Sequence, residues 1–420
     1  MTTPKHKLFV TCGRGCESYL VAELAALGLG SQVTPAFRGA FINDLPRGVS
    51  LMEAIFKVNY QSHLAMRVLL PLRSFEVREK MDLYEQIKSV DWRPYIPAGR
   101  TFAIVAKVDH PHFTNTHYAA QLCKDAIVDQ YRERSVERPD VNAQNPDVQV
   151  QVFVHEGQGT VNMDTSVLPL HMRGYRRESV EAPMRETLAA HMLHMAGIPQ
   201  HFRFFNEAEA KESLVLSDPM CGSGTILAEA ALMATQTPAA FLREKWGFTH
   251  LPDFSKKAWD DFKREQFLKR RPLSKRIVIS GTDIDPKAAQ AASQTLRRLG
   301  FNVVENESQM HKTTREDVLG DVLIRREDFR QWAPASPELR PTVVMTNAPY
   351  GQRIGGEATN LRPLYRSLGD FMKQKTRKPA TGWVLTGDLQ LSREVGLQAK
   401  RRHILYNGGI ECRLLEYDLF

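Results

Sequence analysis

One stretch of small residues has the composition of a ligand-binding loop. Residues 214–225 read LVLSDPMCGSGT, so an apolar run leads into a turn with Gly222 and Gly224, and an Ala- and Leu-rich segment follows. A loop of this kind at the start of a helix presents backbone N–H groups, and its glycines let a ligand approach the backbone closely. A dinucleotide fingerprint needs a third glycine where Leu227 stands, and the Gly-Lys-Ser/Thr of a phosphate-binding loop is absent. The loop alone therefore leaves the ligand open.

A resemblance to a known family narrows the choice. The loop resembles the first motif of the Rossmann-like S-adenosylmethionine (SAM) methyltransferases, in the form D-P-x-C-G-S-G-T. The alternative, a strand-to-helix turn without a ligand, is disfavoured by the downstream matches. The resemblance implies that SAM is the cofactor and that these loop residues bind it: Asp218, Pro219, Cys221, Gly222, Ser223, Gly224 and Thr225.

An acidic residue follows the next apolar run, residues 276–281. At the end of the second strand this fold places an acid that accepts hydrogen bonds from both ribose hydroxyls, a charge-assisted pairing. The resemblance assigns Asp283 to the ribose and its neighbour Ile284 to the cofactor site. Asp285 is suited to cap the helix that opens at Pro286.

The third motif of this fold is an Asp-containing loop after the third strand. Here the strand is expected over residues 321–324, and Asp328 and Phe329 follow it. The resemblance places the Asp328 side chain against the adenine amino group and Phe329 beside the adenine ring.

A second motif points to the group that accepts the methyl. Residues 346–351 read TNAPYG and resemble the N-P-P-Y signature of amino-directed methyltransferases, with Ala348 where proline is usual. An exocyclic amine is a poor nucleophile because its lone pair is delocalised into the base. The Asn347 side-chain oxygen and the Ala348 carbonyl can hold its two N–H groups out of the ring plane, while Tyr350 stacks on the base. Positioning then supplies most of the acceleration. We expect Asn347, Ala348, Pro349 and Tyr350 to be catalytic, with Asn347 also touching the cofactor.

The elements that carry these motifs alternate between strand and helix from residue 211 onward. Such alternation predicts a parallel sheet with helices on both faces, in which ligands bind beyond the carboxyl ends of the strands. A closing hairpin is expected over residues 402–417, turning at Asn407-Gly408-Gly409. An insertion, residues 235–274, is rich in basic and aromatic residues. It could contact RNA, but packing of its rings on the protein is slightly favoured.

The N-terminal part divides into two patterned regions. Residues 1–75 predict a small ferredoxin-like α/β unit that includes a strand over 37–42 and a helix over 51–70. Residues 76–168 predict strands near 102–108 and 148–154 around a helix, in a strand–helix–strand–strand order. That layout, with its basic residues, resembles the THUMP domain of RNA-modifying enzymes.

The THUMP resemblance implies RNA contacts from basic side chains of this region. A solvated surface position is about as good an interpretation for any single residue. The candidate RNA-binding residues are Lys107, Lys124, Arg132 and Arg134.

Residues 169–198 form the expected linker and cap helix before the methyltransferase domain, residues 199–420. In the family this segment leads into the methyl-donor site, so the resemblance places Arg173 and Tyr175 near the cofactor. The fold class expected is a Rossmann-like class I SAM methyltransferase domain with an N-terminal ferredoxin-like and THUMP α+β region.

Composition sets broad limits on the function. Lys and Arg number 56 against 48 Asp and Glu, a net charge of +8, which suits a polyanionic partner without requiring one. No apolar run approaches the ~18 residues of a membrane helix. The five cysteines are scattered, which favours free thiols in a reducing cytoplasm, and no metal site is indicated.

Nearly the whole chain resembles the THUMP-containing methyltransferases of the RlmL type, which make N2-methylguanosine in bacterial 23S rRNA. The phrases that carry this resemblance are HMRGYR, APMRETLAAHML, DPMCGSGTILAEAALMA, KWGF, GTDID and NAPYGQRI. It implies SAM-dependent transfer of a methyl group to the exocyclic N2 of a guanine in structured RNA. Many such chains continue into a second methyltransferase domain; since this one ends at Phe420, we expect no second activity in it.

Four other functions remain open from the sequence. A tRNA guanine-N2-methyltransferase shares the architecture, and N-P-P-Y also serves N6-adenine and glutamine-amide methylation. A non-catalytic RNA-binding or ribosome-assembly factor should have lost the donor-site residues, which are all present. A thiouridine synthetase needs an S-G-G-x-D-S loop, and the chain has none.

Overall fold

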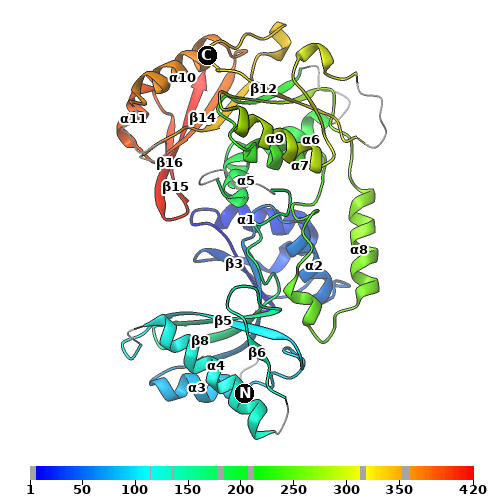
Figure 1. The fold of residues 1–420 in the computed structure, drawn as a ribbon, viewed down its shortest axis with the longest axis vertical. Coiled ribbons are helices and arrows are strands. Elements are labelled where there is room, and N and C mark those ends of the chain that lie inside the picture. The colour runs from blue at the N-terminus through cyan, green and yellow to red at the C-terminus, as the bar shows by residue number, and fades with distance from the viewer. Residues whose placement is uncertain are drawn as a thin grey trace. The chain divides into compact units, whose positions relative to one another are not determined.

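The computed structural model describes residues 6–113, 115–134, 137–176, 184–206, 212–312, 318–351 and 360–420. These form two compact units, each with an eight-stranded sheet (Figure 1). The first unit comprises Met1–Cys12, Cys16–Met172 and Glu244–Arg264, and the second comprises Gly13–Gly15, Arg173–Arg243 and Glu265–Phe420. Within the described ranges, no helix combines the length and the apolar character needed to cross a membrane.

The first unit has one continuous sheet in the order β2-β3-β1-β4-β8-β7-β5-β6. Its strands are β1 Leu8–Thr11, β2 Val33–Ala36, β3 Gly39–Ile42, β4 Arg67–Glu76, β5 Thr101–Asp109, β6 Asp140–Val141, β7 Val148–His155 and β8 Gln158–Asp164. Strand β4 pairs antiparallel with β1 on one side and with β8 on the other. The residues on either side of position 75 therefore share a single sheet.

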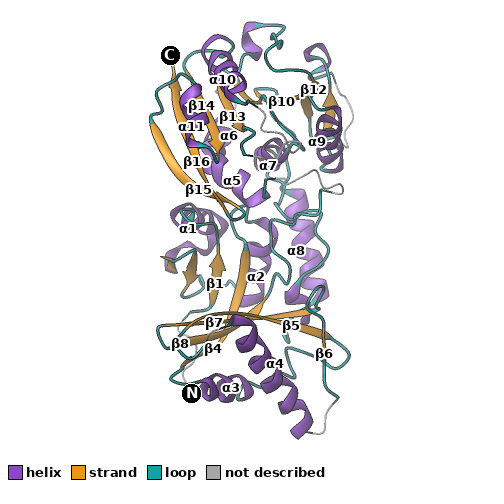
Figure 2. Cartoon of the chain, turned by 60° about the vertical axis from the view of Figure 1, so that its left-hand side comes forward, coloured by secondary structure: helices purple, strands orange, loops and turns teal. Residues whose placement is uncertain are grey.

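The helices of this unit follow the apolar spacing of the sequence. They are α1 Glu17–Leu24, α2 Leu51–Gln61, α3 Lys80–Lys88, α4 Thr116–Glu133 and α8 Lys256–Leu268, the last of which belongs to this unit as far as Arg264, with short helical turns η1 Ala25–Leu29, η2 Gly30–Gln32 and η3 Gly247–His250. Figure 2 shows α3 and α4 together on one face of the part of the sheet formed by β4, β8, β7 and β5. The side chains that α4 buries recur at helical spacing and include Ala119, Cys123, Ala126 and Ile127.

Two expectations for residues 1–75 were wrong at their boundaries. The helix expected over 51–70 ends at Gln61, because the Glu23 carboxylate accepts the backbone N–H of His63 at 2.8 Å and draws the chain out of the helix. Strand β4 then begins at Arg67. The strand expected over 37–42 begins at Gly39, since the two residues before it form the turn between β2 and β3.

The aromatic residues in the middle of the insertion, segment 244–264, pack within the first unit. The rings of Phe248 and Trp259 lie 5.1 and 5.0 Å from Phe56 of α2, and Trp259 also lies 5.3 Å from Tyr60. Figure 1 shows α8, in lime green, beside α2, in blue. A Cβ on Gly247 would lie 2.2 Å from the Asp164 carbonyl oxygen, so only glycine allows this close approach to the end of β8. Ring packing therefore accounts for the aromatic residues of segment 244–264.

The second unit has the predicted parallel sheet. Its order is β11-β12-β10-β9-β13-β14-β16-β15, parallel except for β16, which runs antiparallel to both neighbours. The strands are β9 Leu214–Asp218, β10 Ile277–Asp283, β11 Asn302–Val304, β12 Asp321–Arg326, β13 Val343–Asn347, β14 Ala380–Thr386, β15 Arg401–Asn407 and β16 Ile410–Leu419. The closing hairpin expected at the end of the chain is present as β15 and β16.

Helices cover both faces of this sheet. They are α5 Glu186–Met195, α6 Ile198–Asn206, α7 Thr225–Ala234, α9 Pro286–Arg298, α10 Arg362–Gln374 and α11 Leu389–Glu394, with short turns η4 Glu307–Gln309 and η5 Pro337–Leu339. Consecutive residues of β13 face opposite cores: Val343 and Met345 pack in the cluster that contains α7, and Val344 in the one that contains α10. The expected fold class is confirmed.

Replacing Trp259 by alanine should lower the free energy of unfolding of the first unit by about 3–5 kcal/mol, because a buried indole is removed from a closed aromatic cluster. Lys257→Ala is the matched control, since that side chain is 90% exposed on the same helix. Urea unfolding followed by tryptophan fluorescence and circular dichroism measures both. Equal stability of the two variants would contradict the packing assigned to the insertion.

Candidate active site

The glycine loop joins β9 to α7, and its two glycines have different structural roles. Gly224 has a φ of +76°, and a Cβ there would lie 2.9 Å from the Ala292 Cβ, so this glycine allows α7 and α9 to pack closely. Gly222 has a φ of +54°, and a Cβ there would meet nothing within 4 Å. The Cys221 N–H donates to the Thr282 carbonyl at 2.9 Å, which ties the loop to β10. The loop is therefore anchored to β10, with open space beside Gly222.

Asp283, at the end of β10, is held in place by the loop. One carboxylate oxygen accepts the Gly222 N–H at 2.8 Å and the other accepts the Asp285 N–H at 2.9 Å. Burial raises the pKa of Asp283, and these two backbone N–H groups oppose the rise. Asp285 caps α9 by accepting the Lys287 N–H at 2.9 Å, the role expected for it, and the neighbouring Ile284 is 68% exposed.

Asp218 is a second acid at the same sheet edge. It is 2% exposed, and burial raises its pKa to about 7. The Thr346 hydroxyl and the Met220 N–H oppose this rise, and the nearby Asp283 adds to it. Two acids with raised pKa values create a region where a positively charged ligand group is favoured.

Asp328 and Phe329, the two residues expected to contact adenine, each contact another side chain of the protein. The Asp328 carboxylate accepts from the Arg330 guanidinium, with both oxygens 2.9 Å from Nε, and this pairing lowers the pKa of Asp328. Phe329 is 4% exposed, with its ring edge-on to Phe371 at 5.7 Å. Contact of Asp328 and Phe329 with adenine stays a prediction.

The Asn-Ala-Pro-Tyr loop leaves β13 next to the glycine loop, since β13 pairs with β9. The Ala348 N–H donates to the Leu385 carbonyl at 3.1 Å, and the Tyr365 hydroxyl donates to the Pro349 carbonyl at 3.0 Å. The Asn347 side-chain oxygen is buried and has no hydrogen-bond partner among the residues that the structure describes. The loop thus holds a buried acceptor ready for a donor from elsewhere.

Tyr350 is oriented by the closing hairpin. Its hydroxyl accepts a hydrogen bond from the Asn407 amide at 3.0 Å, and the Cys412 thiol lies 3.4 Å away. A Cβ on Gly387 would lie 2.6 Å from the ring, so glycine is needed beneath it. Sequence reasoning treated Asn407 only as a turn residue and Tyr365 only as part of a helix. No local pattern could have linked either residue to this loop.

The segment before α5 contacts α7, the helix that follows the glycine loop. Arg173 and Tyr175 lie in the core, 1% and 2% exposed, and both reach the Glu229 carboxylate of α7, Arg173 at 3.4 Å and Tyr175 through its hydroxyl at 3.1 Å. The next residue, Arg176, donates to the Thr225 hydroxyl at 2.7 Å, at the start of α7. Arg176 therefore contacts the glycine loop, whereas its two neighbours support the helix that follows.

The predicted RNA-binding residues all lie in the first unit. Lys124, Arg132 and Arg134 pair with Asp125, Asp129 and Asp91 at 2.9, 3.2 and 3.0 Å. Lys107 lies 5.9 Å from the Phe153 ring centre, and burial lowers its pKa. Exposed ion pairs of this kind are weak and can exchange for phosphate. Contact with RNA stays a prediction for these four residues.

The donor-site residues fit SAM. Asp218 and Asp283 suit its positive charge and its ribose, Ile284 offers an exposed apolar surface for the adenine, and the space above Gly222 lets a ligand lie against the loop.

The affinity for SAM should rise with pH up to about pH 7 and level off above it. A cation favours the ionised form of Asp218, so binding lowers its pKa from about 7 and releases a proton. As the pH is raised toward about 7, the dissociation constant for SAM should then fall by up to about tenfold per pH unit. Calorimetric titration of the wild type and of Asp218→Asn measures this, and the variant should bind more weakly with a flatter profile. Identical profiles would contradict the assignment of Asp218.

Comparison with known proteins identifies the family. Residues 173–416 match the family model described as "RMKL-like, methyltransferase domain", and residues 77–164 match the THUMP domain. The chain is 34% identical over 422 residues to the ribosomal RNA large subunit methyltransferase K/L of Pseudomonas aeruginosa, with 98% of this chain and 52% of the relative covered. The protein of the same name from Syntrophotalea carbinolica is 34% identical, with 98% and 53% covered. The chain thus spans about half the length of the curated relatives it matches.

Solved structures share the fold over the full length. The crystal structure of SMU.472 complexed with SAH has a TM-score of 0.76 at 23% identity, covering 100% of this chain and 99% of that one. A "possible methylase" from Clostridium difficile 630 has a TM-score of 0.77 at 26% identity, covering 99% and 98%. The family that the sequence resembles is confirmed and, with it, the methyl donor SAM. The chain belongs to the RMKL-like methyltransferase family and carries a THUMP domain in its N-terminal half.

Proposed function

We propose that this protein transfers a methyl group from SAM to the exocyclic N2 amine of a guanine in structured RNA, with bacterial 23S rRNA as the substrate and the cytoplasm as the compartment. The name of the curated relatives, ribosomal RNA large subunit methyltransferase, supports the choice of RNA. The THUMP match over residues 77–164 supports RNA binding by the N-terminal half.

The observation that carries the proposal is the buried acceptor on Asn347. A buried side-chain oxygen rarely lacks a hydrogen-bond partner, because desolvation without compensation is unfavourable by about 1–3 kcal/mol. Among the described residues, the Asn347 oxygen has none. An N–H of an exocyclic amine would satisfy it, and the Ala348 carbonyl could take the second N–H.

The chain's residues act by positioning. Asn347 and Ala348 turn the amine so that its lone pair leaves the ring plane, and Tyr350 fixes the plane of the base. When bound, SAM supplies an electrophilic methyl carbon, and its positively charged sulfur is the leaving group when the amine lone pair attacks that carbon. Asp218 and Asp283 hold the donor, so the acceleration comes from placing two reactants in line. The amine's extra proton is acidic after transfer and can pass to solvent.

The base reaches this site only after leaving its stack. Flipping a nucleotide out of structured RNA is unfavourable by a few kcal/mol. Phosphate contacts from the first unit, among them Lys107, Lys124, Arg132 and Arg134, would offset that penalty. We assign RNA capture to residues 76–168 and methyl transfer to residues 199–420.

Product identification tests the proposal. Purified protein is incubated with tritiated SAM and, separately, with total tRNA, protein-free 23S rRNA and 16S rRNA from unmodified cells, and the RNA is digested to nucleosides. Label in N2-methylguanosine from 23S rRNA alone is expected. Asn347→Ala should abolish the label and leave the SAM dissociation constant nearly unchanged, because the lost acceptor binds the amine.

Asn302→Ala is the matched control, since its amide donates to Asp321 at 2.7 Å elsewhere in the same sheet. Label in tRNA alone would identify tRNA as the substrate, and label in N6-methyladenosine would identify adenine as the target base. Undiminished turnover by Asn347→Ala would reject the mechanism. SAM binding without label in any RNA would favour a protein amide target or a role in ribosome assembly.

Asn407 should act as a positioning residue for Tyr350. Loss of its hydrogen bond in Asn407→Ala should lower kcat/KM for RNA by up to about tenfold, the equivalent of one hydrogen bond, and leave SAM affinity unchanged. If Asn407 acts through the Tyr350 hydroxyl, Asn407→Ala combined with Tyr350→Phe should be no slower than Tyr350→Phe alone. Fully additive losses in this double-mutant cycle would show that Asn407 acts elsewhere.

A further inference from the structure

The Tyr365 hydroxyl ties the substrate loop, residues 347–350, to the buried side of α10. The Tyr365 side chain is fully buried in the second unit, and its hydroxyl donates to the Pro349 carbonyl at 3.0 Å. Its ring packs in the same buried cluster as Ala348. A phenylalanine ring would fill the same space, but only tyrosine can make this hydrogen bond.

This bond is the last of three in a row. The Asp388 N–H donates to the Thr386 hydroxyl at 3.1 Å, and the Thr386 and Tyr365 hydroxyl oxygens are 2.7 Å apart. Since the Tyr365 proton is directed to Pro349, the Thr386 hydroxyl is the donor between the two. Its other acceptor, the Asp388 carbonyl, is more distant at 3.4 Å. Each buried hydroxyl thus both accepts and donates, and hydrogen bonds in such a chain strengthen one another.

The turn that follows β14 supports the substrate loop at a second point. Gly387 lies between Thr386 and Asp388, and a Cβ on it would be 2.6 Å from the Tyr350 ring. Residues 386–388 therefore contact the loop directly at Tyr350 and, through Tyr365, at the Pro349 carbonyl.

The Pro349 carbonyl controls the direction of its neighbours. The proline ring fixes its own φ at about −65° and restricts Ala348 to extended conformations. Because peptide groups are planar, the ψ of Pro349 is the main torsion left free between the Ala348 carbonyl and Tyr350. The hydrogen bond from Tyr365 sets that torsion. The Ala348 N–H, which donates to the Leu385 carbonyl at 3.1 Å, holds the other end of the loop.

We propose that Tyr365 is a positioning residue for methyl transfer: its hydroxyl fixes the Pro349 carbonyl and thereby aims the Ala348 carbonyl and the Tyr350 ring at the target base. The inference rests on the proposed function, in which these two groups hold the base that carries the amine. RNA has many other contacts, whereas the amine is aligned by this loop alone. Loss of the hydroxyl should therefore slow the chemical step and leave binding unchanged.

Tyr365→Phe tests the hydroxyl, since it removes one oxygen and keeps the buried ring. Tyr417→Phe is the matched control. Tyr417 is 1% exposed in the same buried cluster, it lies opposite Gly382 of β14, and within the described ranges its hydroxyl makes no hydrogen bond to the substrate loop. The single-turnover rate constant is measured at saturating SAM and saturating RNA, with the RNA that the wild type labels. Dissociation constants for SAM and RNA and melting curves accompany it.

The rate constant should fall by about 10- to 100-fold in Tyr365→Phe, with both dissociation constants unchanged. Tyr417→Phe should keep the wild-type rate constant. Thr386→Val removes the donor to Tyr365 but leaves the bond to Pro349, so a smaller loss is expected. Thr386→Ser keeps the hydroxyl and should keep most of the rate. The two Thr386 variants decide the question if Tyr365→Phe unfolds.

Hydrogen–deuterium exchange of the full chain reports on the loop without a substrate. A peptide that covers residues 346–351 should exchange faster in Tyr365→Phe than in the wild type or in Tyr417→Phe, because the loop has lost one of its attachments. Wild-type exchange of this peptide in Tyr365→Phe would overturn the inference.

Two kinetic results would also overturn it. An unchanged rate constant in Tyr365→Phe would show that the hydroxyl does not position the loop for catalysis. Equal losses in Tyr365→Phe and Tyr417→Phe would reduce the effect to general destabilisation of the cluster. Failure of the proposed function is seen separately, as wild-type protein that labels no RNA, and the exchange of the loop then still decides whether Tyr365 holds it.

Discussion

The parallel pairing of β9 with β10 on one side and β13 on the other is the constraint on which the site depends. In this register Gly281 lies opposite Asp218, and Ser217 lies opposite Val344. Because the three strands run in the same direction, their carboxyl ends meet at one edge of the sheet. Three motifs far apart in the sequence thereby converge: the glycine loop, the acid after β10 and the loop that begins at Asn347. Each contributes one function, and none would form a site alone.

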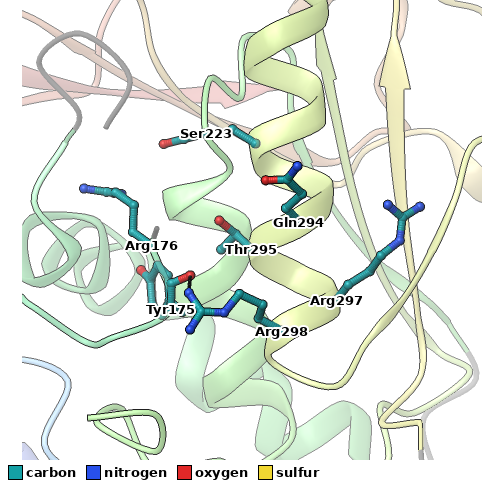
Figure 3. A pocket seen from close by; sticks show the side chains of 8 residues that line it. Tyr175, Arg176, Ser223, Gln294, Thr295, Arg297 and Arg298 are labelled. Carbon is teal, nitrogen blue, oxygen red and sulfur yellow. Dashed lines mark hydrogen bonds between the residues drawn. The ribbon is translucent and has the colours of Figure 1, made fainter. Parts of the chain in front are cut away.

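The charges around this edge are separated by sign. Asp218 is buried and Asp283 is half-buried at the ends of neighbouring strands, where they favour a cation. A cavity along α9 is lined by Arg176, Arg297 and Arg298 (Figure 3). Thr225 connects the two regions, because it begins the helix after the glycine loop and accepts a hydrogen bond from Arg176.

Short-range sequence patterns predicted the features that depend on short-range interactions. Alternating strands and helices, the glycine loop and the cap at Asp285 could all be read from the sequence, because each depends on residues close together in the chain. Residues that act across the fold could not. Asn407 is 57 positions from Tyr350, and its contact exists only because β16 returns beside β14. The helix expected over 51–70 ended early for the same reason, since Glu23 of another helix takes the N–H of His63.

The aromatic residues of the insertion have a consequence for how such proteins can evolve. Segment 244–264 lies within the sequence of the methyltransferase region but completes the core of the first unit around Phe56 and Tyr60. A gene fragment that ends at residue 172 would encode α2 without the rings that cover it. A fragment that begins at 173 would encode α8 without the partner for its apolar side. A break in the gene between the two family matches would thus leave the first core incomplete and the apolar side of α8 uncovered. The ring cluster around Phe56 and Tyr60 therefore depends on two segments of the chain that are far apart in the sequence.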